Sequence, residues 1–167
     1  MSRTVEQRVL EFWNASGARP RPGVVSNDLA AAAQRLGRTL PLEVASYFLC
    51  ANGTEDTCLD LFEAWPLDKI GSVPDVVAPF SGIPDYSQIA KHLPNAADYF
   101  AFADAMIWSQ VFAVRLSADN VATEVVWICG SSYAVIAPTF AAFWELLLAD
   151  PKAAIWATST VIKSPAV

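Results

Sequence analysis

The sequence contains few of the side chains that carry most metal binding and nucleophilic catalysis. Its 167 residues include one histidine, His92, and three cysteines, Cys50, Cys58 and Cys129, none of which forms a C-x-x-C pair. A zinc site draws about four ligands from histidine, cysteine and carboxylate groups at characteristic spacings. The glycine-rich motifs that cradle phosphates and dinucleotides are also missing from the sequence. We therefore expect no metal, no cofactor and reduced cysteine thiols.

Positive charge is scarce as well. The chain has 11 Lys and Arg residues against 17 Asp and Glu residues, which gives a formal net charge of −6. Proteins that bind nucleic acids or anionic membranes concentrate basic residues, whereas here Arg19 and Arg21 form an isolated pair interrupted by a proline. Partners of both kinds are therefore disfavoured. The acidity would attract a basic protein partner, although it could also serve only to keep the protein in solution.

Long apolar runs are missing too. None approaches the ~20 residues of a membrane-spanning helix, and residues 1–8 lack the apolar stretch of a secretory signal, so we expect a cytoplasmic protein. The 54% hydrophobic content predicts a large core and leaves room for a second apolar surface that another molecule covers. A single domain is expected over residues 1–167, with a helix and a proline-rich connector in 1–23, a core in 27–150 and a tail in 151–167.

Helical periodicity dominates the first part of the chain. Apolar residues recur on one face of a helix in residues 5–13, with Thr4 and Gln7 as a capping box and Gly17 as its end. Two further helices are predicted, one at 28–36, capped by Ser26 or Asn27 and closed by Gly37, and one from Thr39-Leu40-Pro41 to a stop at Asn52-Gly53.

The later part of the chain shows the alternation that is typical of strands. Strands are predicted at 59–65, 99–102, 110–116, 123–129 and 133–136, followed by a helix at 138–149. Residues 71–98 carry four prolines and little periodicity, which favours a long functional or variable loop. Because consecutive strands follow one another without intervening helices, the fold class is predicted as α+β. We expect an antiparallel meander of about four to six strands, packed by N-terminal helices and a C-terminal helix.

One motif offers a catalytic alternative. Gly130-Ser131-Ser132 follows an apolar strand and approaches the nucleophile elbow of serine hydrolases, which needs a histidine later in the chain. His92 precedes Ser132, and the strand order is not that of a hydrolase, so a polar turn is the favoured interpretation and a Ser132 hydrolase the less favoured one. His92 itself is predicted to be a solvated loop residue, with a pH-switch role left open. We therefore predict that the protein is not an enzyme.

Two segments are the predicted contact surfaces for a partner. The first is the 71–98 loop and the second is the hairpin that joins the strands at 99–102 and 110–116. Aspartates in these segments could meet basic groups, and tryptophan is enriched at protein contacts, although core packing of the tryptophan is an equal alternative. The candidate partner-binding residues are Asp75, Asp85, Tyr86, Asp104 and Trp108.

The order and spacing of several short motifs resemble the SUKH superfamily. The similarity runs from about Asn27 to Asp150. It rests on Leu36-Gly37-Arg38-Thr39-Leu40-Pro41, on Tyr47-Phe48 leading to Asn52-Gly53, on Phe62 to Ile70, on Tyr99 to Asp104, on Val111 to Leu116, and on Ile136-Ala137 with Phe140, Phe143 and Leu147. The sequence departs from the family at Ala105-Met106, where a glycine is often found in the hairpin.

The resemblance implies a protein that binds and neutralises a cognate toxin, often a nuclease, as bacterial immunity proteins of this superfamily do. An acidic inhibitor that blocks a basic nuclease cleft is consistent with the net charge of −6. The alternative implied by the cell-wall regulators of the superfamily is a scaffold or regulatory protein that binds an endogenous protein. A homodimer is left open.

Overall fold

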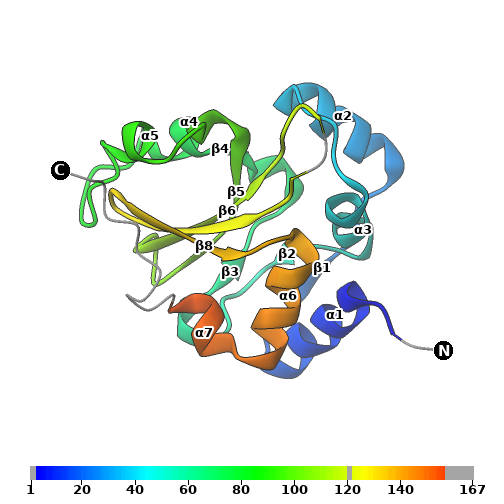
Figure 1. Ribbon diagram of the computed structural model, residues 1–167. Helices are drawn as coiled ribbons and strands as arrows, with labels where there is room; N and C mark the ends of the chain where they lie inside the picture. The colour runs from blue at the N-terminus through cyan, green and yellow to red at the C-terminus, as the bar shows by residue number, and fades with distance from the viewer. Residues whose placement is uncertain (1–2, 120–121, 157–167) are drawn as a thin grey trace.

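An antiparallel six-stranded sheet forms the centre of this α+β fold (Figure 1). The computed structural model describes residues 3–119 and 122–156. The strands are β3 (Glu63–Ala64), β4 (Gly71–Ser72), β5 (Tyr99–Ala105), β6 (Gln110–Arg115), β7 (Val125–Cys129) and β8 (Ser132–Ala137). Their order is β3-β5-β6-β7-β8, and β4 also pairs with β5. Each of the last four strands is antiparallel to the next, which confirms the predicted meander.

Both faces of the sheet are covered, and the three interior strands β5, β6 and β7 are buried almost throughout. Side chains alternate between the faces, as the pleat of a strand requires. Phe112 and Val114 of β6 join one core cluster, and Val111 and Ala113 join the other.

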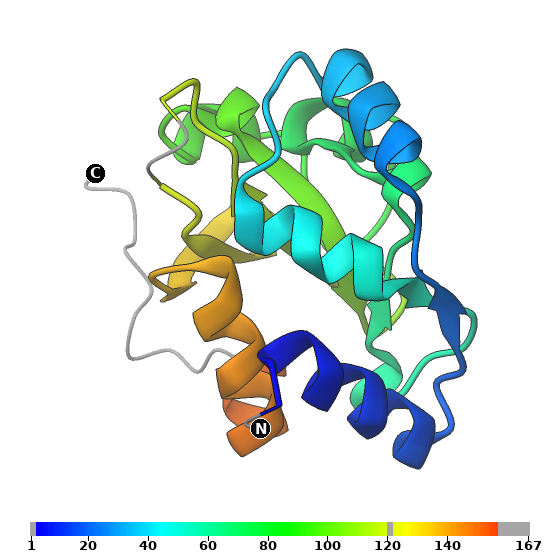
Figure 2. The ribbon, with the colours of Figure 1, turned by 90° about the vertical axis from the view of Figure 1, so that its right-hand side faces the viewer.

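Helices from the two ends of the chain cover the first face. These are α1 (Val5–Ser16), α3 (Leu42–Cys50), α6 (Phe140–Ala149) and α7 (Pro151–Ile155), and α1 lies beside α6 and α3 (Figure 2). The contact is aromatic, because Tyr47 stacks on Trp144 with ring centroids 4.7 Å apart and Trp13 meets Trp144 edge-on at 5.5 Å. The predicted capping box of Thr4 and Gln7 begins α1. The N-terminal helix is thus part of the core.

The second face is covered by residues 71–98, which are more ordered than the predicted long loop. They contain β4, α4 (Val73–Val77), α5 (Ile89–His92) and the 3-10 helix η3 (Ala96–Asp98). Val73, Val77, Ile89 and Leu93 pack against the sheet in a second core cluster. The sequence pattern did not reveal these helices, because each is a single turn or little more and leaves no apolar periodicity to detect.

Near the start of the chain, a small sheet replaces two predicted features. The proline-rich segment predicted as a connector forms β1 (Pro20–Pro22), which pairs antiparallel with β2 (Ala51–Thr54). Asn52-Gly53, predicted as a helix stop, lies inside β2, so α3 runs directly into a strand. A Cβ on Gly53 would come within 2.5 Å of the Ala64 carbonyl oxygen, so only glycine fits there.

Two other predicted boundaries were wrong. Helix α2 (Ser26–Leu36) begins at Ser26 with Val25 as its cap, and the backbone N–H of Val25 donates to the Asp28 carboxylate at 3.1 Å. The strand predicted from residue 59 is shorter, because residues Leu59–Leu61 form the 3-10 helix η1 and only β3 follows. Of the predicted tail, α7 is helical, and residues 157–167 lie outside the described part of the chain.

Candidate functional site

Asp75 and Asp85, two of the five residues predicted to bind a partner, are exposed and held in local turns. At the start of α4, Asp75 accepts a hydrogen bond from the Ser72 hydroxyl at 2.6 Å. Asp85 accepts hydrogen bonds from the backbone N–H of Ser87 at 2.8 Å and from its hydroxyl at 3.0 Å. These bonds, the backbone one first, lower the pKa of Asp85 from its usual value. Both carboxylates are therefore available to solvent.

The other three predicted residues, Tyr86, Asp104 and Trp108, are brought together in one network. The backbone N–H of Trp108 donates to Asp104 Oδ1 at 3.1 Å, and the Tyr86 hydroxyl donates to the Trp108 carbonyl oxygen at 2.7 Å. Asp104 Oδ2 also accepts from the Trp65 indole N–H at 2.6 Å. Asp104 and Tyr86 are buried, so they support the hairpin tip from behind and Trp108 is the half-buried member that lies toward the surface.

The backbone of this hairpin tip is unusual. Met106, Ile107 and Trp108 have φ values of 53°, 54° and 64°, in the left-handed region. Side chains with a Cβ disfavour this region by about 1–2 kcal/mol per residue, and β-branched residues such as isoleucine are rarest there. Natural hairpins of this kind place asparagine, aspartate or glycine at such positions.

A second left-handed segment lies against the first. Asp60 and Leu61 have φ values of 52° and 56°, and the Asp60 carbonyl oxygen accepts a hydrogen bond from the Met106 N–H at 3.3 Å. Among the described residues, seven non-glycine residues have positive φ, and five of them belong to these two segments. Such conformations persist only where the surrounding structure fixes them, and they concentrate at functional sites.

The same two segments carry exposed apolar side chains. Ile107 is 76% exposed, and Leu59, Leu61 and Met106 are also exposed. Trp156, at the end of α7, joins them because its indole N–H donates to Asp60 Oδ2 at 2.7 Å. We call the group formed by residues 59–61, 106–108 and 156 the tip surface. It holds five of the ten exposed large apolar side chains in the described part of the chain.

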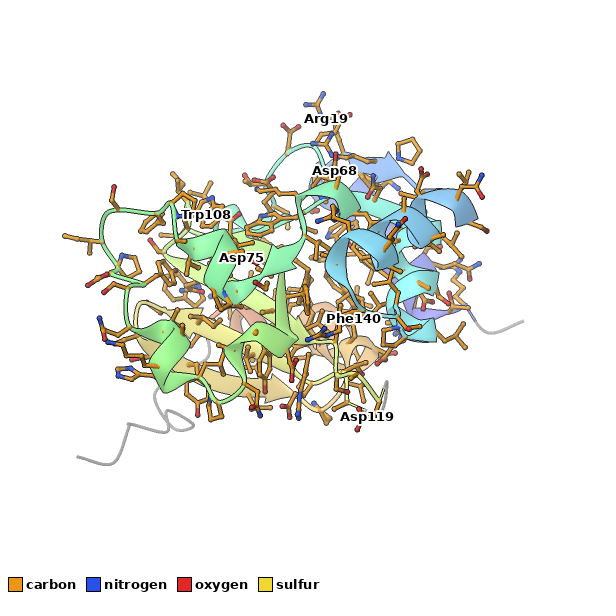
Figure 3. All side chains as sticks on the ribbon, turned by 90° about the horizontal axis from the view of Figure 1, so that it is seen from above. Arg19, Asp68, Asp75, Trp108, Asp119 and Phe140 are labelled. Carbon is orange, nitrogen blue, oxygen red and sulfur yellow. The ribbon has the colours of Figure 1, made fainter. Side chains whose placement is uncertain are left out.

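A block of aromatic rings lies behind the tip surface. Trp108 contacts Trp65 with ring centroids 4.9 Å apart and stacks on Phe80 at 6.1 Å, and Phe80 meets Tyr86 edge-on at 5.3 Å. The Lys69 ammonium lies 4.1 Å from the centre of the Trp65 ring. In the view from above, Trp108 and Asp119 lie at opposite sides of the molecule (Figure 3). The tip surface lies at the end of the sheet where β5 and β6 join, and these aromatic rings pack behind it.

Acidic side chains lie in the tip surface and beside it. Asp60 lies within it, Glu63 lies opposite Asp104 in the pairing of β3 with β5, and Asp85 precedes Tyr86. A basic side chain, Lys69, lies beside Glu63, and its ammonium is 3.7 Å from the Glu63 carboxylate. A basic partner would therefore meet an apolar centre with acidic groups at its margin.

The residues of the catalytic alternative do not form a triad. The ring nitrogen Nδ1 of His92 lies 3.1 Å from the backbone carbonyl oxygen of Ser131, not from the hydroxyl of Ser132. Within residues 3–119 and 122–156, no group of three or more histidine, cysteine, aspartate or glutamate side chains is placed to hold a metal ion. The three cysteines are free, and burial raises the pKa of each thiol.

For several residues of the tip surface, membership of this surface could not be predicted from the sequence. Leu59 and Leu61 look like alternating strand residues, and Trp156 meets Asp60 across 96 positions of the chain. The one usable signal was the run of large side chains at Met106-Ile107-Trp108, where a hairpin turn is expected to be polar.

Comparison with known proteins adds no further assignment: no protein-family model matches the chain, and no curated protein matches it. Among the helices of the described residues, none is long and apolar enough to cross a membrane.

Proposed function

We propose that this protein works by binding another protein at the tip surface, without turnover, and that it is an immunity-type protein that neutralises a toxin. The observation that carries this proposal is the coincidence of left-handed backbone and exposed apolar side chains in the same two segments. Neither feature helps the chain to fold. A partner that covers the apolar side chains would explain why both are kept.

The tip surface has the physical properties of a binding hot spot. Ile107 is 76% exposed, and two hydrogen bonds anchor the tip that carries it. The Trp108 backbone N–H donates to the buried Asp104 carboxylate, and the Tyr86 hydroxyl donates to the Trp108 carbonyl oxygen. A preorganised apolar anchor loses little conformational entropy when it enters a pocket of a partner. Large aromatic side chains beside such an anchor, here Trp108 and Trp156, are enriched among residues that dominate binding energies.

The charge balance and the resemblance to the SUKH superfamily support a toxin as the partner. A net charge of −6 speeds the approach of a basic protein such as a nuclease. The resemblance adds the expectation that the partner is a toxin that the protein neutralises by occupying its surface. The protein would then act in the cytoplasm, where the toxin meets its target.

The experiment that tests the proposal mixes the purified chain with the product of the neighbouring gene and measures complex formation by calorimetry. A stoichiometric complex, together with protection of cells that express the neighbouring product, is expected. If that product does not bind, or if cells are not protected, the immunity proposal is wrong. Binding of an endogenous protein in its place would point to the scaffold or regulatory alternative.

A pair of matched variants then tests the tip surface. Ile107→Asn removes the apolar anchor, and asparagine tolerates the left-handed conformation better than isoleucine does, so the fold is retained while affinity falls at least tenfold. Val25→Asn is the control, because Val25 is also an exposed apolar residue and asparagine is favoured at a helix cap. Equal affinities of the two variants would place the binding site elsewhere.

A further inference from the structure

Lys69 places a positive charge on the aromatic block behind the tip surface. It lies at the end of the 3-10 helix η2 (Leu67–Lys69), and its ammonium is 4.1 Å from the ring centre of Trp65 and 5.5 Å from that of Trp108. The two rings are inclined by 36°. The faces of aromatic rings carry the negative side of their quadrupole, so a cation that lies over Trp65 and beside Trp108 is attracted by both rings. We call this position the cation slot.

The two rings are held in place independently of Lys69. The Asp104 carboxylate accepts hydrogen bonds from the Trp65 indole N–H and from the Trp108 backbone N–H. Phe80 stacks on Trp108 with an interplanar angle of 13°. A slot built in this way keeps its shape when its occupant leaves, which is what a binding site requires.

Lys69, by contrast, is held loosely. Its nearest carboxylate oxygen, on Glu63, lies at 3.7 Å, beyond hydrogen-bond distance, and the Lys69 side chain is 37% exposed. An exposed cation–π contact contributes about 0.5–1 kcal/mol, and fixing a lysine side chain costs up to about 2 kcal/mol of rotamer entropy. The ammonium can therefore leave the slot and move toward Glu63 at little cost.

We propose that the cation slot over Trp65 and beside Trp108 is a binding site, that Lys69 occupies it in the free protein, and that an arginine side chain of the bound partner replaces Lys69. Arginine fits better than lysine because its planar guanidinium stacks on indole rings and is more weakly hydrated than an ammonium. Glu63 and the displaced Lys69 then pair at the margin.

The position of the slot agrees with the partner chemistry. Trp108 belongs both to the slot and to the tip surface, so a partner that covers Ile107 brings its neighbouring side chains over the slot. The acidic net charge of −6 favours a basic partner, which is rich in arginine or lysine. This inference deepens the proposed function and depends on it for the identity of the partner, but the slot can be tested without one.

The test titrates N-acetyl-arginine amide into the full chain and follows the indole N–H signals of Trp65 and Trp108 by NMR. Weak binding is expected in the wild type because Lys69 competes. The Lys69→Ala variant should bind the probe about fivefold more tightly, which corresponds to the ~1 kcal/mol of a cation–π contact. Lys91→Ala is the matched control, because Lys91 is an exposed lysine on α5, and it should bind like the wild type.

Two outcomes would overturn the inference. One is equal affinity of the Lys69→Ala and Lys91→Ala variants for the arginine probe, with circular dichroism showing both folded. The other is equal binding of N-acetyl-norleucine amide, which has a similar stem without the charge and would reveal an apolar slot only. Neither outcome affects the binding of the neighbouring gene product at Ile107. Conversely, a slot that binds arginine in a chain that binds no such product would leave this inference standing and contradict the immunity proposal.

Discussion

The Trp65 indole N–H donates to the Asp104 carboxylate at 2.6 Å, in a position where Asp104 is only 3% exposed. The second oxygen of the same carboxylate accepts the backbone N–H of Trp108. One buried carboxylate thus holds the Trp65 ring of the cation slot and the backbone of Trp108, the last residue of the left-handed tip. An aspartate that the sequence presents as a surface charge is in the structure the internal support of the candidate site.

Asp104→Asn is expected to lower the free energy of unfolding by about 2 kcal/mol. The substitution keeps the shape of the side chain, but its amide nitrogen can only donate, so one of the two N–H groups loses its acceptor in a buried position. Asp68→Asn, at an exposed position of η2, should change stability by less than about 0.5 kcal/mol. Urea denaturation of both variants measures the difference, and equal midpoints would mean that the network does not hold the hairpin.

Ile107→Asn is expected to raise the free energy of unfolding by about 0.5–1 kcal/mol, opposite to the usual effect of a substitution. The left-handed conformation is energetically unfavourable for isoleucine, whereas asparagine tolerates it. Because Ile107 is 76% exposed, little apolar burial is lost. Val135→Asn, at an exposed position of strand β8, should be destabilising because asparagine is disfavoured in strands. Thermal unfolding that ranks the two variants the other way would argue against strain at the tip.

Much of the fold follows from local signals in the sequence. The capping box of Thr4 and Gln7 begins α1 and Gly17 ends it in the left-handed conformation, because these interactions span only a few residues. The meander also follows, since β5 to β8 are separated by turns too short for a parallel crossover. The α+β class needed only the order of helical and alternating segments.

The candidate site could be predicted only in part. Trp108 was identified because a large aromatic residue at a hairpin turn is unusual. The left-handed conformation of Asp60 and Leu61 has no signature in residue type, because tertiary contacts impose it against local preference. The cation slot could not be predicted because only Lys69 and Trp65 are close in sequence. Trp108 is distant in sequence, and the pairing of strands in the sheet brings it beside them.

Tyr86→Phe is expected to reduce the loss of stability at alkaline pH. Burial raises the pKa of Tyr86 above its ordinary value of about 10. Above that pH the unfolded chain loses its phenolic proton while the folded chain keeps it, so the unfolded state binds fewer protons and stability falls as pH rises. The stability that comes from the shifted pKa of Tyr86 is therefore fully present below about pH 10. Burial raises the pKa of Tyr47 and Tyr99 as well, so some alkaline loss remains in the variant.

The measurement compares urea denaturation of the wild type and the Tyr86→Phe variant at neutral pH and at about pH 11. At neutral pH the variant should be less stable by about 1 kcal/mol, because Tyr86 no longer donates to the Trp108 carbonyl oxygen. At alkaline pH this gap should narrow. A gap that stays constant would show that Tyr86 ionises equally in both states.

Asp85→Lys is expected to slow association with a basic partner more than Asp75→Lys does. Asp85 is next to Tyr86, whose hydroxyl holds Trp108 in the tip surface. Asp75 lies at the start of α4 and lines a separate hollow of about 400 Å³ with Arg35 and Arg38, so a partner seated at the tip approaches the two charges unequally. Stopped-flow association at low ionic strength measures the difference, which should shrink as salt shortens the range of the field to about 10 Å at 0.1 M. Equal slowing by both substitutions would indicate that only the overall net charge guides the approach, and slowing by Asp75→Lys alone would move the contact surface toward α4.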